Sequence, residues 1–238
     1  MSAQNIIFSQ RLAEPSHNAQ FRDKAKSFIS RHKGIAAVEL PVMAALFAAP
    51  LFTFSSGILG IAFVLLMSWL RRSNIRDLGL SRPTSWFKTI LRGVAAVTII
   101  LTVQGFVVQP LLRHLFAQPP DFSRFHSMNL SQLVGWIAAG WVMGAFIEEI
   151  IRVYLISRIV ELLGDTRAGL FGAVVGSSLF YALNHDYQGF AGAIGAVVTC
   201  IGLGLLYLFS KRNLWSNVIC HGLNDSVGFI AIYFGALS

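Results

Sequence analysis

Charged residues are scarce in this chain of 238 residues: they make up 13% of it, against 55% for hydrophobic residues. A soluble domain of this length normally carries about a quarter charged residues. The deficit excludes an ordinary soluble protein, and the mean hydropathy of +0.62 agrees with that conclusion. We therefore predict an all-α fold, a polytopic bundle of transmembrane helices whose surface largely faces the lipid bilayer.

Cysteine is rare as well, with only Cys200 and Cys220, both inside apolar runs. This excludes a disulfide scaffold and gives no support for metal binding by thiolates. The net charge of +8 comes from lysines and arginines in short stretches between apolar runs, without an aromatic-interleaved basic face. No nucleic-acid partner is therefore predicted. The first 33 residues lack the apolar core of a signal peptide and are rich in basic residues, which predicts a cytoplasmic N-terminal segment over residues 1–33.

Apolar runs long enough to cross a membrane, about 20 residues each, recur along the rest of the chain. The run from 34 to 70 is too long for one helix and predicts a hairpin that turns near residues 53–57. With five later segments this makes about seven spans, which form one transmembrane domain over residues 34–238. No internal repeat is evident, which argues against a transporter built from inverted repeats. The later segments lie near 92–112, 131–163, 168–185, 189–210 and 213–236.

Basic residues indicate the orientation of these spans. Most of the 19 lysine and arginine residues precede residue 34 or fall in loops on the same side of the membrane, whereas Arg113 and Arg124 fall on the other side. The positive-inside rule then places the N-terminus in the cytoplasm and the C-terminus outside. We expect an integral protein of the cell membrane.

Charged side chains within membrane helices are costly, so each is a functional candidate by default. Glu148, Glu149 and Arg152 share the long segment near 131–163. Arg152 can reach Glu148 at i+4 or Glu149 at i+3. In one plausible division Arg152 holds one carboxylate while the other stays free and serves as a general base.

Two later segments carry histidines. His185 ends the segment near 168–185, and His221 and Asp225 lie one turn apart on the last segment, hence on one helix face. At 1.5 Å per residue, Glu148 and His185 lie at similar depths of roughly 22 and 25 Å, while His221 and Asp225 lie roughly 12 and 18 Å deep. The match of the last two residues is looser and requires a tilted helix or a recessed turn. With that, acids and histidines from three helices converge near the middle of the membrane.

Each group also has a structural interpretation. A lone intramembrane histidine is usually a hydrogen-bond partner between helices. Glu148, Glu149 and Arg152 alone fit a structural ion-pair cluster, and His221 with Asp225 fits an oriented core pair. Their common level is what favours a functional site. Glu39, near the cytoplasmic end of the first segment, is interpreted as a structural residue in contact with interfacial water.

These three stretches, in this order, resemble the CAAX protease and bacteriocin-processing family of glutamic intramembrane peptidases, which includes the Ras-converting type. The resemblance covers residues 131–235. The chain has two residues rather than the usual three between the second glutamate and the arginine, a tyrosine where phenylalanine is usual, and an aspartate where Ras-converting enzymes have asparagine. The matching residues are Glu148, Glu149 and Arg152, then Tyr181 and His185, then His221 and Asp225.

The resemblance implies an endopeptidase in which Glu148 and His185 activate a water, Glu149 and Arg152 support the site, and His221 with Asp225 stabilises the oxyanion or protonates the leaving amine. A metal-free site is preferred, although Glu148, His185 and His221 would also suit Zn²⁺. The expected substrate is a membrane-anchored or lipidated protein or peptide. A proton-coupled transporter and a catalytically silent membrane scaffold remain as alternatives.

Overall fold

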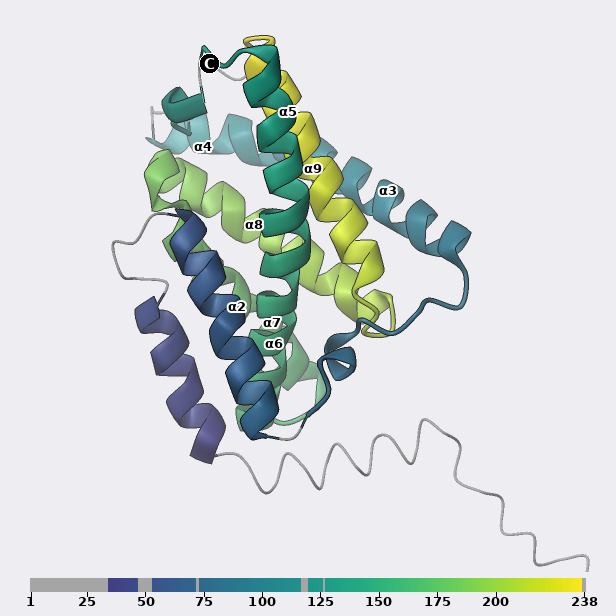
Figure 1. The fold of residues 1–238 in the computed structure, drawn as a ribbon. Coiled ribbons are helices and arrows are strands. Elements are labelled where there is room, and N and C mark those ends of the chain that lie inside the picture. The colour runs from purple at the N-terminus through teal and green to yellow at the C-terminus, as the bar shows by residue number, and fades with distance from the viewer. Residues whose placement is uncertain (1–33, 47–52, 72, 117–119, 126, 237–238) are drawn as a thin grey trace, which may run out of the picture.

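The computed structural model describes residues 34–46, 53–71, 73–116, 120–125 and 127–236, and in them all regular structure is helical (Figure 1). This confirms the predicted all-α fold; the segment 1–33 lies outside the described residues. After a first helix, Gly34–Leu46, the elements are α2 (Thr53–Leu70), the 3₁₀ turn η3 (Ile75–Leu78), α3 (Trp86–Val103), the π-helix η4 (Gln104–Val108), α4 (Gln109–Phe116), the 3₁₀ turn η5 (Ser123–Phe125), α5 (Leu130–Ala139), the π-helix η6 (Gly140–Glu148), α6 (Glu149–Leu163), α7 (Arg167–Ala182), the 3₁₀ turn η7 (Leu183–Gln188), α8 (Gly189–Phe209) and α9 (Trp215–Tyr233).

The outer surface is that of a membrane protein. Among the described residues, three stretches are long and apolar enough to cross a bilayer: Trp86–Phe116, Leu130–Leu163 and Gly189–Phe209. Large apolar side chains point outward, and Phe87, Phe106 and Phe209 are 75%, 82% and 82% exposed. Such a surface favours lipid over water. The chain is an integral membrane protein.

The other predicted spans are helices that are shorter or more polar. Gly34–Leu46 and Gly57–Leu70 are short apolar helices. Helix α7 has 16 residues, and α9 carries asparagines, a histidine and an aspartate among its 19. A sequence window overestimates the length of such helices because it includes loop residues on either side of them. By length and composition, three of the seven predicted spans qualify as membrane crossings within the described residues.

Two boundaries differ from the prediction. The expected turn at residues 53–57 is wrong, since these residues form the start of α2. Threonine and serine are common in turns, but they are equally favoured at helix N-termini. The expected span ending at His185 stops at Ala182, and His185 lies on the 3₁₀ turn η7. Tightening of the last turn into a 3₁₀ helix is a common way for a helix to end.

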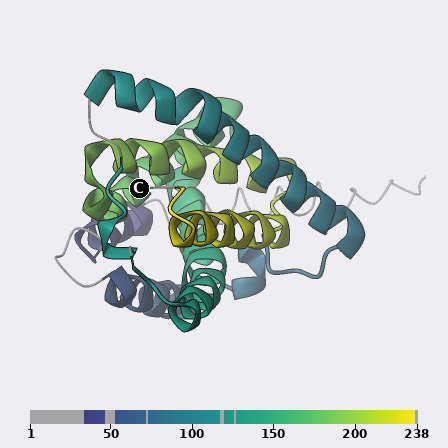
Figure 2. The same cartoon turned by 90° about the horizontal axis from the view of Figure 1, so that it is seen from above.

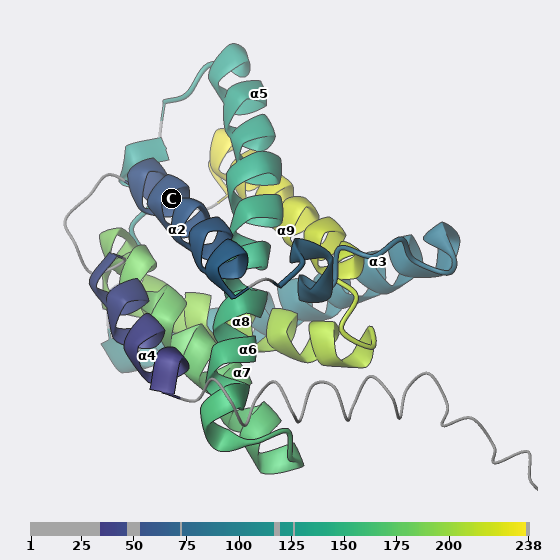
Figure 3. The same cartoon turned by 60° about the horizontal axis from the view of Figure 1, so that its bottom comes forward.

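Helix α6 is the centre of the bundle. Ile151, Val153 and Leu155 on it have no exposed surface. It packs on α7, and α7 packs on α8, while α9 packs on α3 and η6. Seen from above, the continuous helix α3–α4, α8 and α9 lie beside one another (Figure 2). The first helix and α2 lie together on another side, where α2 contacts η6 and α6 (Figure 3).

A buried charge network fastens these two helices to α6. The Glu39 carboxylate accepts hydrogen bonds from Arg71 Nε at 2.6 Å and from the Tyr154 hydroxyl at 2.7 Å. Arg71 and Arg158 also pair with Glu161, at 3.1 and 2.8 Å. The predicted contact of Glu39 with interfacial water is therefore wrong, since the residue is only 2% exposed. Opposite charges from other helices compensate its burial.

Candidate active site

A π-helical stretch carries the first site residue. Residues Gly140–Glu148 form the π-helix η6 between α5 and α6, and such stretches often occur at functional sites. Two glycines allow η6 and α9 to approach closely. A Cβ atom on Gly144 would lie 2.5 Å from Asp225 Oδ2, and one on Gly222 would lie 2.5 Å from the Trp141 ring. At Gly222 a side chain would meet the rigid Trp141 ring, so glycine is required there, whereas at Gly144 it would displace the Asp225 carboxylate.

Glu149 is held on all sides. Its Oε1 accepts hydrogen bonds from Arg152 Nε at 2.9 Å and from His221 Nδ1 at 2.8 Å, and its Oε2 accepts one from Asn217 Nδ2 at 3.0 Å. Glu149 and Arg152 have no exposed surface. From the sequence, Arg152 could pair with either Glu148 or Glu149. In the structure it pairs with Glu149, three residues earlier on the helix. Buried charges of opposite sign stabilise each other in this way only when hydrogen bonds complete the pair.

Glu148 has different surroundings. It lines a cavity, described below, and its carboxylate makes no hydrogen bond or ion pair with any residue that the structure describes. Its main-chain oxygen instead accepts a hydrogen bond from the hydroxyl of Tyr181, whose ring also lies 4.1 Å from the Arg152 guanidinium carbon. Neighbouring helix residues point in different directions, so one glutamate faces the protein and the other faces the cavity. The Glu148 carboxylate is therefore placed to bind a water or a substrate group.

His221 is oriented by Glu149. A carboxylate without a proton only accepts, so Nδ1 of His221 carries the hydrogen in their 2.8 Å contact. The other ring nitrogen, Nε2, lies 3.6 Å from Asp225 Oδ1, too far for a good hydrogen bond. From the sequence, His221 and Asp225 fitted an oriented pair on one helix face, but the role of Asp225 stayed open. The structure adds Glu149 as a closer partner and leaves Nε2 at the cavity, beside Asp225.

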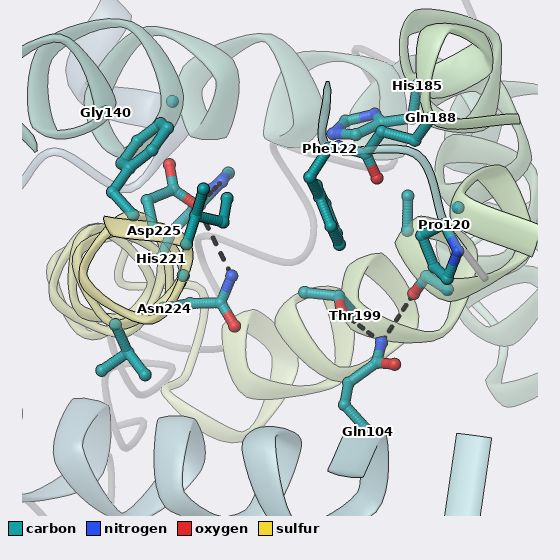
Figure 4. A pocket seen from close by; sticks show the side chains of 18 of the residues that line it. Gln104, Pro120, Phe122, Gly140, His185, Gln188, Thr199, His221, Asn224 and Asp225 are labelled. Carbon is teal, nitrogen blue, oxygen red and sulfur yellow. Dashed lines mark hydrogen bonds and ion pairs between the residues drawn. The ribbon is translucent and has the colours of Figure 1, made fainter. Parts of the chain in front are cut away.

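His185 reaches the cavity from η7. Its Nδ1 lies 2.9 Å from the main-chain oxygen of Tyr181, which can only accept, so Nδ1 is the donor. In the neutral ring, Nε2 then carries the lone pair. The ring stacks on Tyr187, with ring centroids 6.1 Å apart. Figure 4 shows His185 across the cavity from His221 and Asp225.

The cavity has a volume of about 910 Å³, within the range of ligand sites. Aromatic side chains form much of its apolar wall, among them Phe122, Phe125, Trp136 and Phe229. Five of the six predicted site residues line it, while Glu149 lies behind the wall. The five are Glu148, Arg152, His185, His221 and Asp225. The predicted convergence of acids and histidines from three segments thus corresponds to one cavity.

The described residues form no preassembled metal site. Among the described residues, no group of three or more His, Cys, Asp or Glu side chains is placed to hold a metal ion. His221 directs Nδ1 at Glu149, and His185 lies on the other side of the cavity (Figure 4). The alternative zinc set of Glu148, His185 and His221 therefore does not come together in this geometry.

Two contacts of the site were not predicted from the sequence: those of the Asn217 side chain and of the Tyr181 hydroxyl. Asn217 is fully buried and donates from Nδ2 to Glu149 and to the main-chain oxygen of Leu203. It stands four residues before His221, so its place on the same helix face was a usable signal. Tyr181 was identified only as the aromatic member of a motif, and its hydroxyl bond to Glu148 was not predicted.

A family model described as type II CAAX prenyl endopeptidase Rce1-like matches residues 130–227. The matched range contains all six predicted site residues and confirms the resemblance drawn from the three motifs. The match supports a peptidase as the general class of activity. Neither the curated proteins nor the solved structures gave a match.

Proposed function

We propose that this integral membrane protein is an intramembrane endopeptidase that hydrolyses a peptide bond in a membrane-anchored or lipidated protein or peptide. One observation carries the proposal: two adjacent glutamates differ in surroundings. Glu149 is held by three side chains, whereas the Glu148 carboxylate lies at the cavity and pairs with no side chain in the described part of the chain. A carboxylate with no fixed partner is what a general base requires. The family match over residues 130–227 supports the same class of reaction.

In the proposed reaction Glu148 takes a proton from a water in the cavity, with the lone pair of His185 as the second group that orients the water. The hydroxide attacks the carbonyl carbon of the scissile peptide bond, and the electron pair of the C=O bond moves to oxygen. Nε2 of protonated His221 donates a hydrogen bond to this oxyanion. The electron pair of the oxyanion then re-forms the C=O bond as the C–N bond breaks, and the proton held by Glu148 passes to the leaving nitrogen, which gives a carboxylic acid, an amine and the original carboxylate of Glu148.

The remaining groups hold this arrangement in place. Glu149 fixes the His221 ring through Nδ1, and Arg152 balances the charge of Glu149 inside the protein. Asp225, 3.6 Å from Nε2, is placed to exchange a proton with His221. No step requires a metal ion.

The substrate class follows from the location of the site. The cavity has aromatic and aliphatic walls inside an apolar bundle, so a lipidated terminus or a membrane anchor can reach it without leaving the bilayer. The matched family acts, by its description, on CAAX prenyl proteins. A prenylated or otherwise membrane-anchored chain is therefore the proposed substrate.

The test is an assay with purified protein in detergent and a library of tagged, membrane-anchored and lipidated peptides, read by mass spectrometry. The assay is run in H₂¹⁸O, which marks the new carboxyl group and so identifies the cleaved bond. It is repeated after chelation of divalent metals, which tests whether the reaction needs a metal ion. We expect cleavage with one ¹⁸O atom in the new carboxyl group and full activity after chelation. Loss of activity restored by zinc would overturn the metal-free mechanism. Failure to cleave any peptide would favour the transporter or scaffold alternatives.

A further inference from the structure

The loop over residues 120–125 forms a wall of the cavity that the proposed reaction does not use. Four of its residues line the cavity: Pro120, Phe122, Arg124 and Phe125. The loop lies outside residues 130–227, the range that the family model matches. Loops vary more between related proteins than the helices they connect, and they often carry binding residues. This wall is therefore a place where the chain can set its own substrate preference.

The loop is anchored to η7, the turn that carries His185. Asp121 donates its main-chain N–H to the main-chain oxygen of Gln188 at 3.0 Å. The guanidinium carbon of Arg124 lies 4.7 Å from the centroid of the Tyr187 ring, and that ring stacks on His185. A cation over an aromatic ring at this distance is attracted to it. The loop therefore has a fixed position relative to His185.

Phe125 is a second anchor. Its side chain is only 8% exposed, and the centroid of its ring lies 5.1 Å from that of Trp136 and 5.5 Å from that of Phe229. Edge-to-face contacts of this kind are favourable. The main-chain N–H of Phe125 donates to the main-chain oxygen of Phe122 at 2.9 Å. Fixing Phe125 therefore also fixes the main chain at Phe122.

The Phe122 side chain has a different environment. It is partly exposed and lines the cavity, and its ring makes no aromatic contact with the residues that the structure describes. Figure 4 shows the ring pointing into the cavity, between His185 on one side and His221 and Asn224 on the other. An apolar surface at a cavity gains free energy when an apolar group of a ligand covers it. The ring is thus placed to contact whatever the cavity binds.

We propose that Phe122 is a specificity-determining residue that contacts an apolar side chain of the substrate next to the scissile bond. The proposal rests on the peptidase function given above, in which His185 orients the attacking water. A ring beside His185 lies beside the carbonyl group that this water attacks, so it meets a residue that flanks the scissile bond. A charged side chain would lose hydration against the ring, whereas an aliphatic or aromatic side chain gains contact.

The experiment uses a cleaved peptide in which the two residues flanking the scissile bond are replaced, one at a time, by alanine, leucine or tryptophan. At one of these positions we expect the wild type to prefer leucine over alanine by roughly tenfold in kcat/KM, the discrimination that a few apolar carbon atoms provide. In Phe122→Ala this preference should fall below about twofold. The tryptophan peptide should gain relative to the leucine peptide, because its ring can occupy the space of the missing phenyl group.

Two variants separate this role from a structural effect, with thermal melts of each. Phe122→Leu keeps an apolar side chain at the cavity and should retain most of the preference. Phe87→Ala removes a phenylalanine that is 75% exposed on the outer surface of α3, and it should keep the wild-type preferences. Melting temperatures should stay close to that of the wild type, because both rings are at least partly exposed.

The possible failures are distinguishable. Cleavage with no leucine preference at either position, or with the same preference in wild type and Phe122→Ala, would overturn the role of Phe122 and leave the peptidase function intact. An equal loss of preference in Phe87→Ala would also overturn it. Failure of the wild type to cleave any peptide would overturn the peptidase function and this proposal together.

Discussion

At the scale of single residues, the chemistry of this protein depends on the partners of each polar group. Glu148 and Glu149 are adjacent and chemically identical, yet one is fixed by Arg152, His221 and Asn217 and the other faces a cavity. A carboxylate committed to an ion pair cannot exchange protons freely, whereas an unpaired one at a cavity can. The proposed division of roles between base and support rests on this difference.

Tyr181 tests whether the main chain at Glu148 must be held. In Tyr181→Phe the Glu148 carbonyl loses the hydroxyl donor, which should cost about 1 kcal/mol of stability. Displacement of the general base should also lower kcat by roughly tenfold with little change in KM. Tyr154→Phe is the matched control, since its hydroxyl bonds Glu39 outside the cavity. It should lower the melting temperature but not kcat, and equal kcat values in the two variants would contradict the assignment.

The sequence predicts which residues matter but not how they pair. Intramembrane charge alone selects Glu148, Glu149, Arg152, His221 and Asp225. The pairing of Arg152 with Glu149 rather than Glu148 could not be predicted, since both lie within reach on a helix. The orientation of His221 by Glu149 depends on contact between helices far apart in sequence, which no local pattern encodes.

At the scale of elements, the hydrophobic segments predicted the helices well, but not their local geometry. The long segment near 131–163 corresponds to α5, η6 and α6 as one continuous helix. Its π-helical part was not predicted, because an apolar stretch on all faces carries no periodicity that separates a π turn from an α turn. The glycines of this stretch, Gly140 and Gly144, face α9 and give the approach that the site needs.

Gly144→Ala tests that approach. Its methyl group would lie 2.5 Å from Asp225 Oδ2 and 3.5 Å from His221 Nε2. The Asp225 carboxylate is the end of a flexible side chain and can move away, so stability should change by less than about 1 kcal/mol while kcat falls at least tenfold. Melting curves and kinetics measure the two effects.

Two further glycines supply controls for this variant. Gly135→Ala on α5 meets no atom within 4 Å and should leave both stability and kcat unchanged. Gly222→Ala places its methyl group against the rigid Trp141 ring and should destabilise the protein. Wild-type kcat in Gly144→Ala would show that the position of Asp225 is unimportant for catalysis.

Glu39→Gln tests the buried charge network that attaches the first two helices to α6. The change leaves Arg71 with one fewer compensating charge in a buried site and should cost about 3 kcal/mol or more. Asp165→Asn is the control: it breaks the more exposed ion pair between Asp165 and Arg212 and should lower stability by less than about 1 kcal/mol. Thermal melts measure both, and equal shifts would mean that the network contributes little.

At the scale of the whole molecule, composition was sufficient for the class of fold. The charge deficit predicted a helical membrane protein, and the exposed phenylalanines on the surface agree. Arg71 and Arg158 stand next to predicted cytoplasmic loops in the sequence, but in the structure both are buried partners of Glu39 or Glu161. Tertiary pairing of this kind cannot be recognised from local sequence.

The orientation remains a prediction that labelling can test. Thr84→Cys lies in a basic loop and Ser123→Cys in the loop between Arg113 and Arg124, and both positions are exposed. The native cysteines are buried and should react slowly. In intact cells a membrane-impermeant maleimide should label the Ser123 variant and spare the Thr84 variant, because basic loops stay in the cytoplasm. The opposite pattern would reverse the orientation.

The most direct test of the two-glutamate mechanism compares Glu148→Gln with Glu149→Gln, each by cleavage kinetics and thermal melting. Glu148→Gln should keep the wild-type melting temperature and lose roughly 10²–10⁴-fold in kcat, because only the general base is removed. Glu149→Gln should lower both kcat and the melting temperature, because Arg152 and His221 lose the carboxylate that they share inside the protein. The expected loss of stability is about 3–5 kcal/mol. Wild-type cleavage by folded Glu148→Gln, or the same behaviour of both variants, would contradict the assignment of Glu148 as the base.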